Sequence, residues 1–302
     1  MLTKVNYVDD TTVIHAKNLN DIQDAIIELQ SLPAGGGVLS VNGKTPDDAG
    51  DVDLTAADVG AVAVVNNAGA HNAIYRGKNL GTSVTAEQYA AIADGSFADL
   101  YIGDYWVIGG VNYRIAAFDY YYLTGNPKCT THHVTLVPDT SLYNAQYNDT
   151  NSTASGYWNS KMRTEGLNSA RETISNAFGT DHLLYMYRGM STVVSSAGVV
   201  TSTGWVGDRV WLMTEIQVAG CNVFGNTGLG TARAVAWTAD LGQFPLFRHA
   251  KEYIHHGLPY WLTDVSGGGN FVVIDADTAV FSRAASSESG VRPTFSIYGG
   301  SV

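Results

Sequence analysis

Three acidic residues in the last quarter of the chain, Asp264, Asp275 and Asp277, are of the type that binds Ca²⁺. Calcium takes about six to eight oxygen ligands, and three scattered carboxylates do not specify such a cage. As alternate residues of one strand, Asp275 and Asp277 would share a face. We therefore interpret them as surface strand residues, and we expect no required metal and no cofactor.

Two histidine pairs, His132-His133 and His255-His256, raise the question of a zinc site. Adjacent residues on a strand point to opposite faces, so neither pair is suited to chelate one ion. The sequence has no HExxH or CxxC motif to support them. We expect structural or exposed histidines.

Residues that could act as a nucleophile have no recognisable setting. The chain lacks a GxSxG elbow, and nothing in it marks a pair of glycosidase carboxylates. Cys129 and Cys221 form neither a CxxC pair nor a disulfide framework, so the sequence predicts two buried free thiols. No catalytic residue is predicted, and we expect a protein that is not an enzyme.

The composition favours a binding surface. The 302 residues carry 17 basic and 28 acidic side chains, a net charge of −11 that would repel nucleic acid. Seventeen Tyr against nine Phe is typical of surfaces that bind, because Tyr offers rigid contact area with a polar tip. The chain has no run of about 20 apolar residues and no apolar leader, so we expect no membrane insertion and no ordinary secretion signal.

The elements that would position a binding surface begin with an attachment segment, residues 1–34. Residues 16–32 are predicted to form a short helix that ends at Pro33. Its apolar residues have the a/d spacing of a coiled coil, and two heptads are too few to hold a helix alone. We therefore predict trimerisation through Leu19, Ile22, Ile26 and Leu29.

Residues 35–75 are predicted to form a neck and linker. VLSVNGKT and GDVDLTAADVG contain short strand-like alternations, broken by turn signals at Asn42-Gly43 and Ala49-Gly50. Thr55 could cap a brief helical turn through Asp58. A segment with so few large apolar groups cannot fold by itself, so copies of it must share one core.

Residues 76–302 are predicted to form an α+β domain. Thr85 to Gln88 is a capping box for a helix that ends near Ala93. A hairpin turns at Gly109-Gly110, a strand covers 132–138, and 159–179 is helical. Short strands and long loops follow.

The neck sequence resembles a motif of bacteriophage tail-fibre and tail-tip proteins. It carries Ser40-Val-Asn-Gly-Lys-Thr45 and then Gly50-Asp-Val-Asp-Leu-Thr-Ala-Ala-Asp-Val-Gly60. The preceding VNYVDDTTVIHAKNLNDIQDAI looks like the N-terminal segment of tail proteins from phages of Gram-positive hosts. The resemblance covers about 60 residues, and it implies a trimeric fibre.

The last residues are similar to a family found at the ends of such fibres. Tyr260-Trp-Leu-Thr-Asp264, a Gly-rich bridge and Gly290-Val-Arg-Pro-Thr-Phe-Ser-Ile297 carry this resemblance. It implies a C-type-lectin-like fold of the formylglycine-generating-enzyme type, like the variable proteins of diversity-generating retroelements. In those proteins the region matching Ser266 to Ser289 is the binding face. Family members often carry many Asn there, whereas this chain does not.

The resemblance and the residue types together select a candidate binding set. Trp261 and Arg292 are interpreted as structural, the ring in the core and the guanidinium bridging strands. The remaining residues combine aromatic anchors with hydrogen-bonding groups, a mix typical of binding hot spots. The predicted ligand-binding residues are Tyr260, Ser266, Asn270, Phe271, Asp275, Asp277, Phe281, Arg283 and Ser287.

Taken together, the sequence predicts a phage or prophage tail-fibre receptor-binding protein. It would be made in the bacterial host cytoplasm and belong to the virion tail. Its partners would be its own copies, other tail or baseplate proteins, and a bacterial surface glycan or protein. Two alternatives stay open: a tail-tip enzyme that cleaves polysaccharide, and a purely structural baseplate or decoration protein.

Overall fold

The computed structural model describes residues 16–30, 40–55, 57–59, 66–223, 242–255, 257–277 and 280–300. The chain divides into two units, Met1–Val64 and Val65–Val302. The sequence analysis placed this boundary at 75–76. The structure places it earlier because helix α2 (Ala68–Asn72) packs on the domain, where the Asn72 amide bonds the backbone of Phe118.

Among its described residues, the N-terminal unit holds one α-helix, α1 (Ala16–Gln30). Within it Ile22 is 40% exposed and Ile26 48% exposed, and the side chains of Leu19 and Leu29 lie outside the described residues. A short turn with Asn42 and Gly43 at positive φ joins Val41 to Lys44 through two backbone hydrogen bonds. Gly50 is also at positive φ, and Thr55 caps the turn η1 (Ala57–Val59).

The fold class predicted from the sequence is wrong. Strands account for 31% of the protein and helices for 24%, so it is mostly β with small helices rather than α+β. The helix near the N-terminus is short and no long coiled coil is evident in the described part, and the predicted β neck is reduced to the one bridge at Val41–Lys44. Local helix signals are easy to see in a sequence, whereas these strands are short and acquire their partners from distant segments. The predicted C-type-lectin-like architecture falls with that class.

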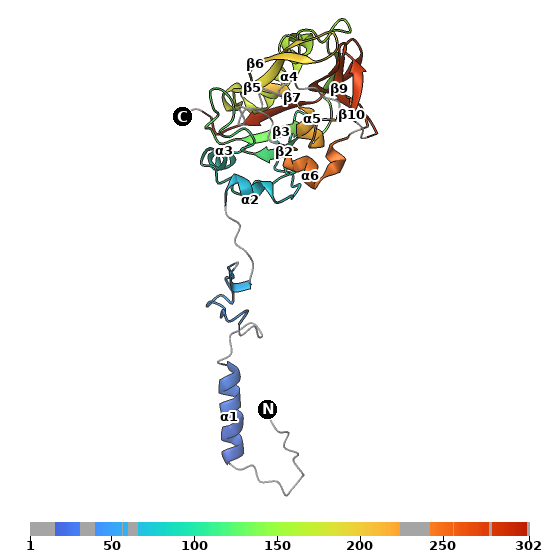
Figure 1. The fold of residues 1–302 in the computed structure, drawn as a ribbon. Coiled ribbons are helices and arrows are strands. Elements are labelled where there is room, and N and C mark those ends of the chain that lie inside the picture. The colour runs from blue at the N-terminus through green and yellow to red at the C-terminus, as the bar shows by residue number, and fades with distance from the viewer. Residues whose placement is uncertain are drawn as a thin grey trace. The chain divides into compact units, whose positions relative to one another are not determined.

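The second unit is built on two five-stranded sheets and a separate hairpin (Figure 1). The first sheet has the order β1-β2-β3-β12-β7, formed by Tyr105–Ile108, Val111–Phe118, Val134–Pro138, Pro293–Ile297 and Val210–Leu212. The second has the order β10-β9-β8-β11-β4, formed by Val280–Ala284, Asn270–Ile274, Tyr260–Gly267, Glu288–Val291 and Tyr143–Gln146. The hairpin pairs β5 (Met186–Val194) with β6 (Val200–Asp208).

Small helices cover the sheets, and two of them, α2 and α6, contact β2 (Figure 1). Helix α3 has the predicted capping box, in which Thr85 accepts from the Gln88 backbone and Gln88 accepts from that of Thr85. A π-helical turn, η2, precedes α4 in the region predicted to be helical. Beyond α2, the bounds are α3 (Ala86–Ala93), η2 (Met162–Gly166), α4 (Asn168–Phe178), η3 (Thr180–His182), α5 (Glu215–Ala219), α6 (Pro245–His249) and η5 (Lys251–Tyr253).

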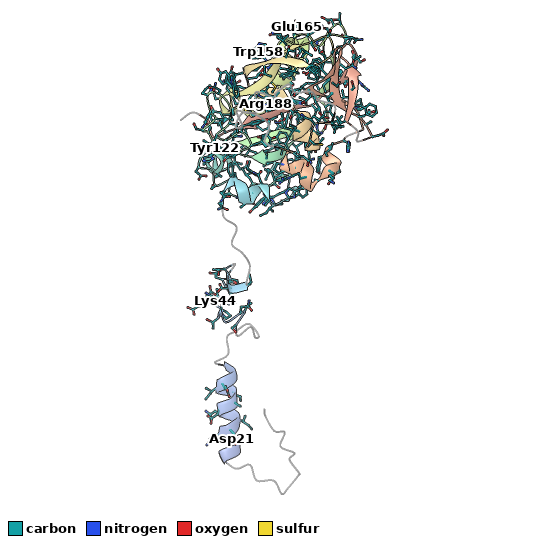
Figure 2. The ribbon with its side chains drawn as sticks, viewed as in Figure 1. Asp21, Lys44, Tyr122, Trp158, Glu165 and Arg188 are labelled. Atoms are coloured by element: carbon teal, nitrogen blue, oxygen red, sulfur yellow. The ribbon has the colours of Figure 1, made fainter. Side chains whose placement is uncertain are left out.

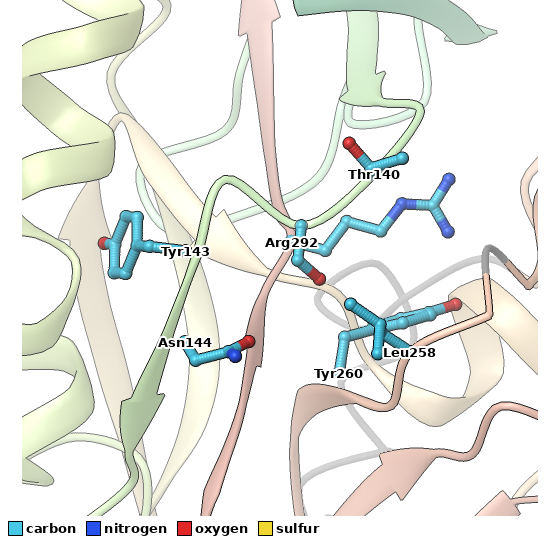
Figure 3. A pocket seen from close by; sticks show the side chains of 7 residues that line it. Thr140, Tyr143, Asn144, Leu258, Tyr260 and Arg292 are labelled. Atoms are coloured by element: carbon cyan, nitrogen blue, oxygen red, sulfur yellow. The ribbon is translucent and has the colours of Figure 1, made fainter.

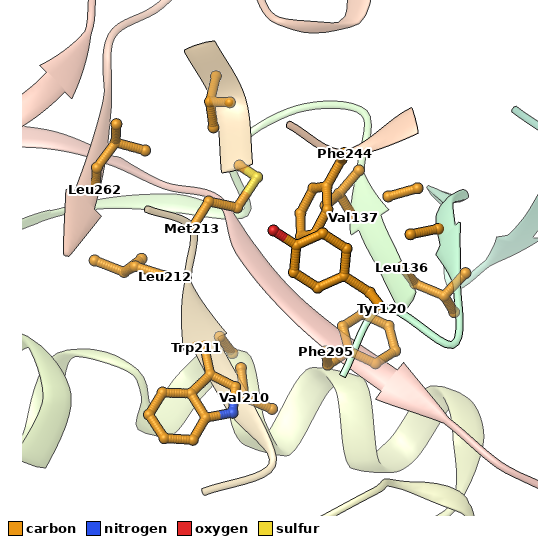
Figure 4. Packing of buried hydrophobic residues seen from close by; sticks show 14 of the residues in the cluster. Tyr120, Leu136, Val137, Val210, Trp211, Leu212, Met213, Phe244, Leu262 and Phe295 are labelled. Carbon is orange, nitrogen blue, oxygen red and sulfur yellow. The ribbon is translucent and has the colours of Figure 1, made fainter. Parts of the chain in front are cut away.

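The core of this unit is rich in aromatic residues, and side chains fill the domain throughout (Figure 2). Around β3, β7 and β12, Tyr120 meets Phe244 edge-on at 4.7 Å between ring centroids (Figure 4). Against the second sheet, the Tyr147 ring stacks on Phe271 and meets Trp261 edge-on. Trp261 is fully buried and its Nε1 donates to the Ala145 carbonyl, so the structural role predicted for it is confirmed.

Two segments cross from one sheet to the other at the same place. The chain leaves β3 of the first sheet at Pro138 and enters β4 of the second at Tyr143, and it returns from β11 to β12 through Arg292. Gly290 permits the close approach, because a Cβ there would lie 2.1 Å from the Ser141 Oγ and 3.0 Å from the Pro259 carbonyl oxygen. This sheet crossing positions the candidate site.

Two local expectations need correction. Asp275 and Asp277 follow β9 in a turn, so they are not alternate residues of a strand. Cys129 and Cys221 are both free thiols, but Cys221 is exposed, because the chain at the end of α5 lies on the surface. None of the helices described is both long and apolar enough to cross a bilayer.

Candidate functional site

A pocket of about 250 Å³ opens at the sheet crossing (Figure 3). Its walls come from the β3–β4 connection, the start of β4, the start of β8, the segment that leads into β8 and the β11–β12 junction. Tyr143 belongs to the wall, but Figure 3 shows its ring pointing away from Arg292, and its hydroxyl donates to the Gly166 carbonyl. The lining residues are Thr140, Ser141, Tyr143, Asn144, Leu258, Tyr260 and Arg292.

Arg292 is the charged residue of this wall, and it is 1% exposed. Its Nε donates to the Pro138 carbonyl at 2.9 Å and its Nη1 to the Ile254 carbonyl at 3.3 Å. Its Nη2 is buried and has no hydrogen-bond partner among the described residues. The guanidinium does bridge the crossing to β3, as predicted, and it keeps one donor free.

The environment of Arg292 disfavours its charge. Burial lowers the pKa of this guanidinium, an effect that the neighbouring Tyr260 opposes. Burial in turn raises the pKa of Tyr260 to about 12. The Tyr260 ring centroid lies 5.1 Å from the Arg292 Cζ, and its hydroxyl donates to the same Ile254 carbonyl. The two side chains therefore form one buried unit at the back of the pocket.

Three polar side chains of the pocket remain available. Thr140 and Asn144 are exposed and Ser141 is half-buried. None of their side-chain atoms forms a hydrogen bond to another residue in the described ranges. Hydroxyl and amide groups placed around a concave surface are suited to orient a polar ligand.

A second arginine lies beside the pocket and is fully paired. Arg114 holds Asp139 through two bonds of 2.6 and 2.7 Å, and its Cζ lies 4.5 Å from the Tyr105 ring and 4.1 Å from that of Tyr253. Asp139 and Tyr253 directly adjoin Pro138 and Ile254, the residues whose carbonyls hold Arg292. Burial and the neighbouring Tyr253 raise the pKa of Tyr75 to about 12, so tyrosines continue the surface beyond the pocket.

Apart from Tyr260, the predicted binding residues lie elsewhere along the second sheet. The Ser266 Oγ is 2.8 Å from the Ser282 Oγ, and the Asn270 amide donates to the same hydroxyl at 3.1 Å. This polar cluster joins β8, β9 and β10, at the opposite end of β8 from Tyr260. Ser282, which the prediction omitted, is its central member.

The other predicted residues separate into exposed and buried groups. Phe281 is 52% exposed on β10, whereas Tyr260 and Phe271 are buried in the core. Arg283 is half-buried, and its Nη1 bonds the Ser289 hydroxyl at 2.8 Å. Asp275 accepts from the backbone of Ala276, Asp277 is exposed, and Ser287 is half-buried in the turn after β10. The structure does not gather these residues into one pocket.

His132, His133 and Asp264 have structural partners, whereas the buried Nδ1 of His255 has no hydrogen-bond partner among the described residues. His132 Nδ1 lies 2.7 Å from an Asp119 oxygen, and the His133 backbone donates to the other oxygen. Asp264 is buried and accepts from the backbone of Glu215, and His256 lies outside the described residues. In the part of the chain that the structure describes, no three His, Cys, Asp or Glu side chains are placed to hold a metal ion.

Comparison with protein families, with curated proteins and with solved structures finds no match for this chain.

The sequence analysis missed the pocket for a definable reason. It named Arg292 and Tyr260 but interpreted the first as purely structural and assigned the second to another face. Thr140, Ser141 and Asn144 carry no motif, and they meet Arg292 only because two distant segments cross between the sheets. The one signal in the sequence is an arginine inside a strand segment, GVRPTFSI, whose other residues are all uncharged.

Proposed function

We propose that this chain is a phage or prophage tail-fibre receptor-binding protein whose C-terminal unit binds a bacterial surface ligand through the sheet-crossing pocket. The observation that carries the proposal is the pocket itself, a concave surface with a free buried donor and three free polar side chains. The adjacent Tyr75, Tyr105 and Tyr253 extend it with amphipathic contact area of the kind found in binding surfaces.

The N-terminal unit supports the assembly part of the proposal. Ile22 and Ile26 are exposed on α1, and a 15-residue helix is marginal in water without packing against a partner. The neck around Val41–Lys44 has turns but no sheet among its described residues. Both observations favour association with copies of the same chain, and we propose a homotrimer that joins other tail or baseplate proteins.

Trimerisation would serve binding through avidity. Three weak sites on one assembly gain about 10²–10⁴ in apparent affinity over one site without any new contact. A pocket of this size, with few charged groups, suits weak and reversible recognition of a repeating surface glycan or protein.

The test is binding of fluorescently labelled protein to a panel of Gram-positive bacteria. We expect strain-selective binding by the full chain, and binding about a hundredfold weaker by the 65–302 fragment. Leu258→Trp, which fills the pocket from an exposed position, should remove binding. Phe281→Ala tests the β10 face and should leave binding unchanged.

Three results would count against the proposal. If the protein assembles as a trimer and binds no strain, a structural tail role replaces receptor binding. If Phe281→Ala or Arg283→Ala removes binding and Leu258→Trp does not, the ligand is bound on β10 rather than in the pocket. Release of reducing sugars from a bound cell wall would indicate an enzyme.

A further inference from the structure

We infer that the sheet-crossing pocket receives an anionic group, a carboxylate or a phosphate carried by a surface glycan, on the free Nη2 of Arg292. This inference rests on the proposed function and specifies the chemical class of its ligand. Thr140, Ser141 and Asn144 would hold the neutral hydroxyl groups beside the anion.

The first argument is the charge balance around the pocket. Asp139 is satisfied by Arg114 through two hydrogen bonds, and it also accepts from Asn112. Arg292 bonds two backbone carbonyls, which are uncharged, and it forms no ion pair with a carboxylate of the described residues, since Asp139 acts on it only from a longer distance. A buried charge without a counter-ion is unfavourable, and a bound anion would compensate it.

The second argument is geometric. A guanidinium recognises carboxylate and phosphate oxygens through its N–H groups, and Nη2 is the part of Arg292 that the protein leaves unused. Bonds from Nε and Nη1 hold the group in one orientation, so little freedom is lost on binding. The pocket volume of about 250 Å³ lies at the small end for ligand sites and suits a single sugar ring or a phosphate with its neighbours.

The third argument concerns shielding. Nη2 is covered in this structure, so the anion has to displace part of the rim to reach it. Leu258 stands at that rim and is 63% exposed, so it is held by little packing. Once the anion is inside, water is excluded, and attraction to the guanidinium is stronger than at an open surface. The net charge of −11 disfavours unspecific anion binding elsewhere.

The experiment titrates the full chain with glucuronate, glycerol 1-phosphate and glucose at constant ionic strength, followed by calorimetry and ligand-observed NMR. We expect at least one of the two anions to bind about tenfold more tightly than glucose. Binding of glucuronate alone identifies a uronic-acid type of glycan, and binding of glycerol phosphate alone identifies a phosphate-containing polymer.

Variants locate the site. Leu258→Trp should weaken anion binding about tenfold or more, whereas Val193→Trp, at an exposed aliphatic position on β5, should not. Arg292→Lys keeps the positive charge but loses the planar set of guanidinium N–H donors, so it should weaken binding too. Tryptophan fluorescence confirms that this variant is folded. Equal binding of all three probes, binding of none, or an unchanged affinity in Leu258→Trp would overturn the inference.

Cell binding separates this inference from the function on which it rests. If the chain binds bacteria selectively and neither excess anion nor Leu258→Trp reduces that binding, the anion site is wrong and the receptor-binding role stands. If the anion binds in the pocket and no strain is bound, the receptor-binding role is wrong and the anion site stands.

Discussion

Helix α1 and the sheet crossing of the second unit differ in how far their apolar side chains are exposed. On α1, Ile22, Ile26 and Ile27 are all exposed. At the crossing, Trp261, Phe295 and Tyr260 are buried within one aromatic core. The contrast indicates that the second unit stabilises itself, whereas the first has apolar surface that only a partner can cover.

The largest expected effect is a loss of stability in the second unit, which buries its own apolar side chains. Trp261→Ala removes a fully buried ring that packs on Tyr147 and bonds the Ala145 carbonyl. We expect the free energy of unfolding to fall by about 3–5 kcal/mol, because the cavity cannot close fully. Urea unfolding followed by tryptophan fluorescence measures this, since all six tryptophans lie beyond residue 76.

The matched control for that variant is Phe281→Ala, which truncates a large aromatic residue that is mostly exposed. Its cost should stay within about 0.5 kcal/mol. Equal losses in the two variants would mean that burial does not distinguish these positions.

A smaller effect depends on pH. Burial lowers the pKa of His133 below its ordinary value of 6.5, while Asp119 opposes this shift and His132 adds to it. In the unfolded chain His133 therefore binds a proton near pH 6.5, whereas in the folded protein it is still neutral at that pH. The free energy of unfolding should fall as the pH decreases from about 7 to about 5, and His133→Gln should make this fall shallower.

Unfolding at several pH values checks this contribution against His249→Gln, which changes an exposed histidine. Parallel pH profiles for the wild type and His133→Gln would show that the pKa of His133 is the same in the folded and the unfolded state.

The smallest effect on the stability of the second unit is expected from substitutions in the N-terminal unit. Changing both Ile22 and Ile26 to Asp should leave the tryptophan-monitored unfolding unchanged, because these residues lie outside the second unit. The same change should convert the proposed trimer to monomers in light scattering, since charges would replace its apolar stripe. Ile27→Asp, outside that stripe, is the control.

If the wild type is monomeric, or if the double variant remains trimeric, the apolar stripe of α1 does not drive trimerisation. A loss of stability in the second unit would contradict the separation on which the comparison rests.

Features that depend on neighbouring residues in the chain were predictable from the sequence. The capping box of Thr85 and Gln88, the hairpin at Gly109-Gly110, the turn at Asn42-Gly43 and the helix near residue 16 follow from bonds between residues a few positions apart. These interactions are local, so they form regardless of how the rest of the chain folds.

The balance of strand over helix and the location of the candidate site depend on contacts between distant segments. Arg292 meets Pro138 across 154 positions and Ile254 across 38. No pattern of spacing predicts which polar atom such an encounter leaves without a partner. Phe271 looked like a binding residue because its type suits binding, yet the pairing of distant strands buried it. Residue type is set by the sequence, and exposure is set by what packs against it.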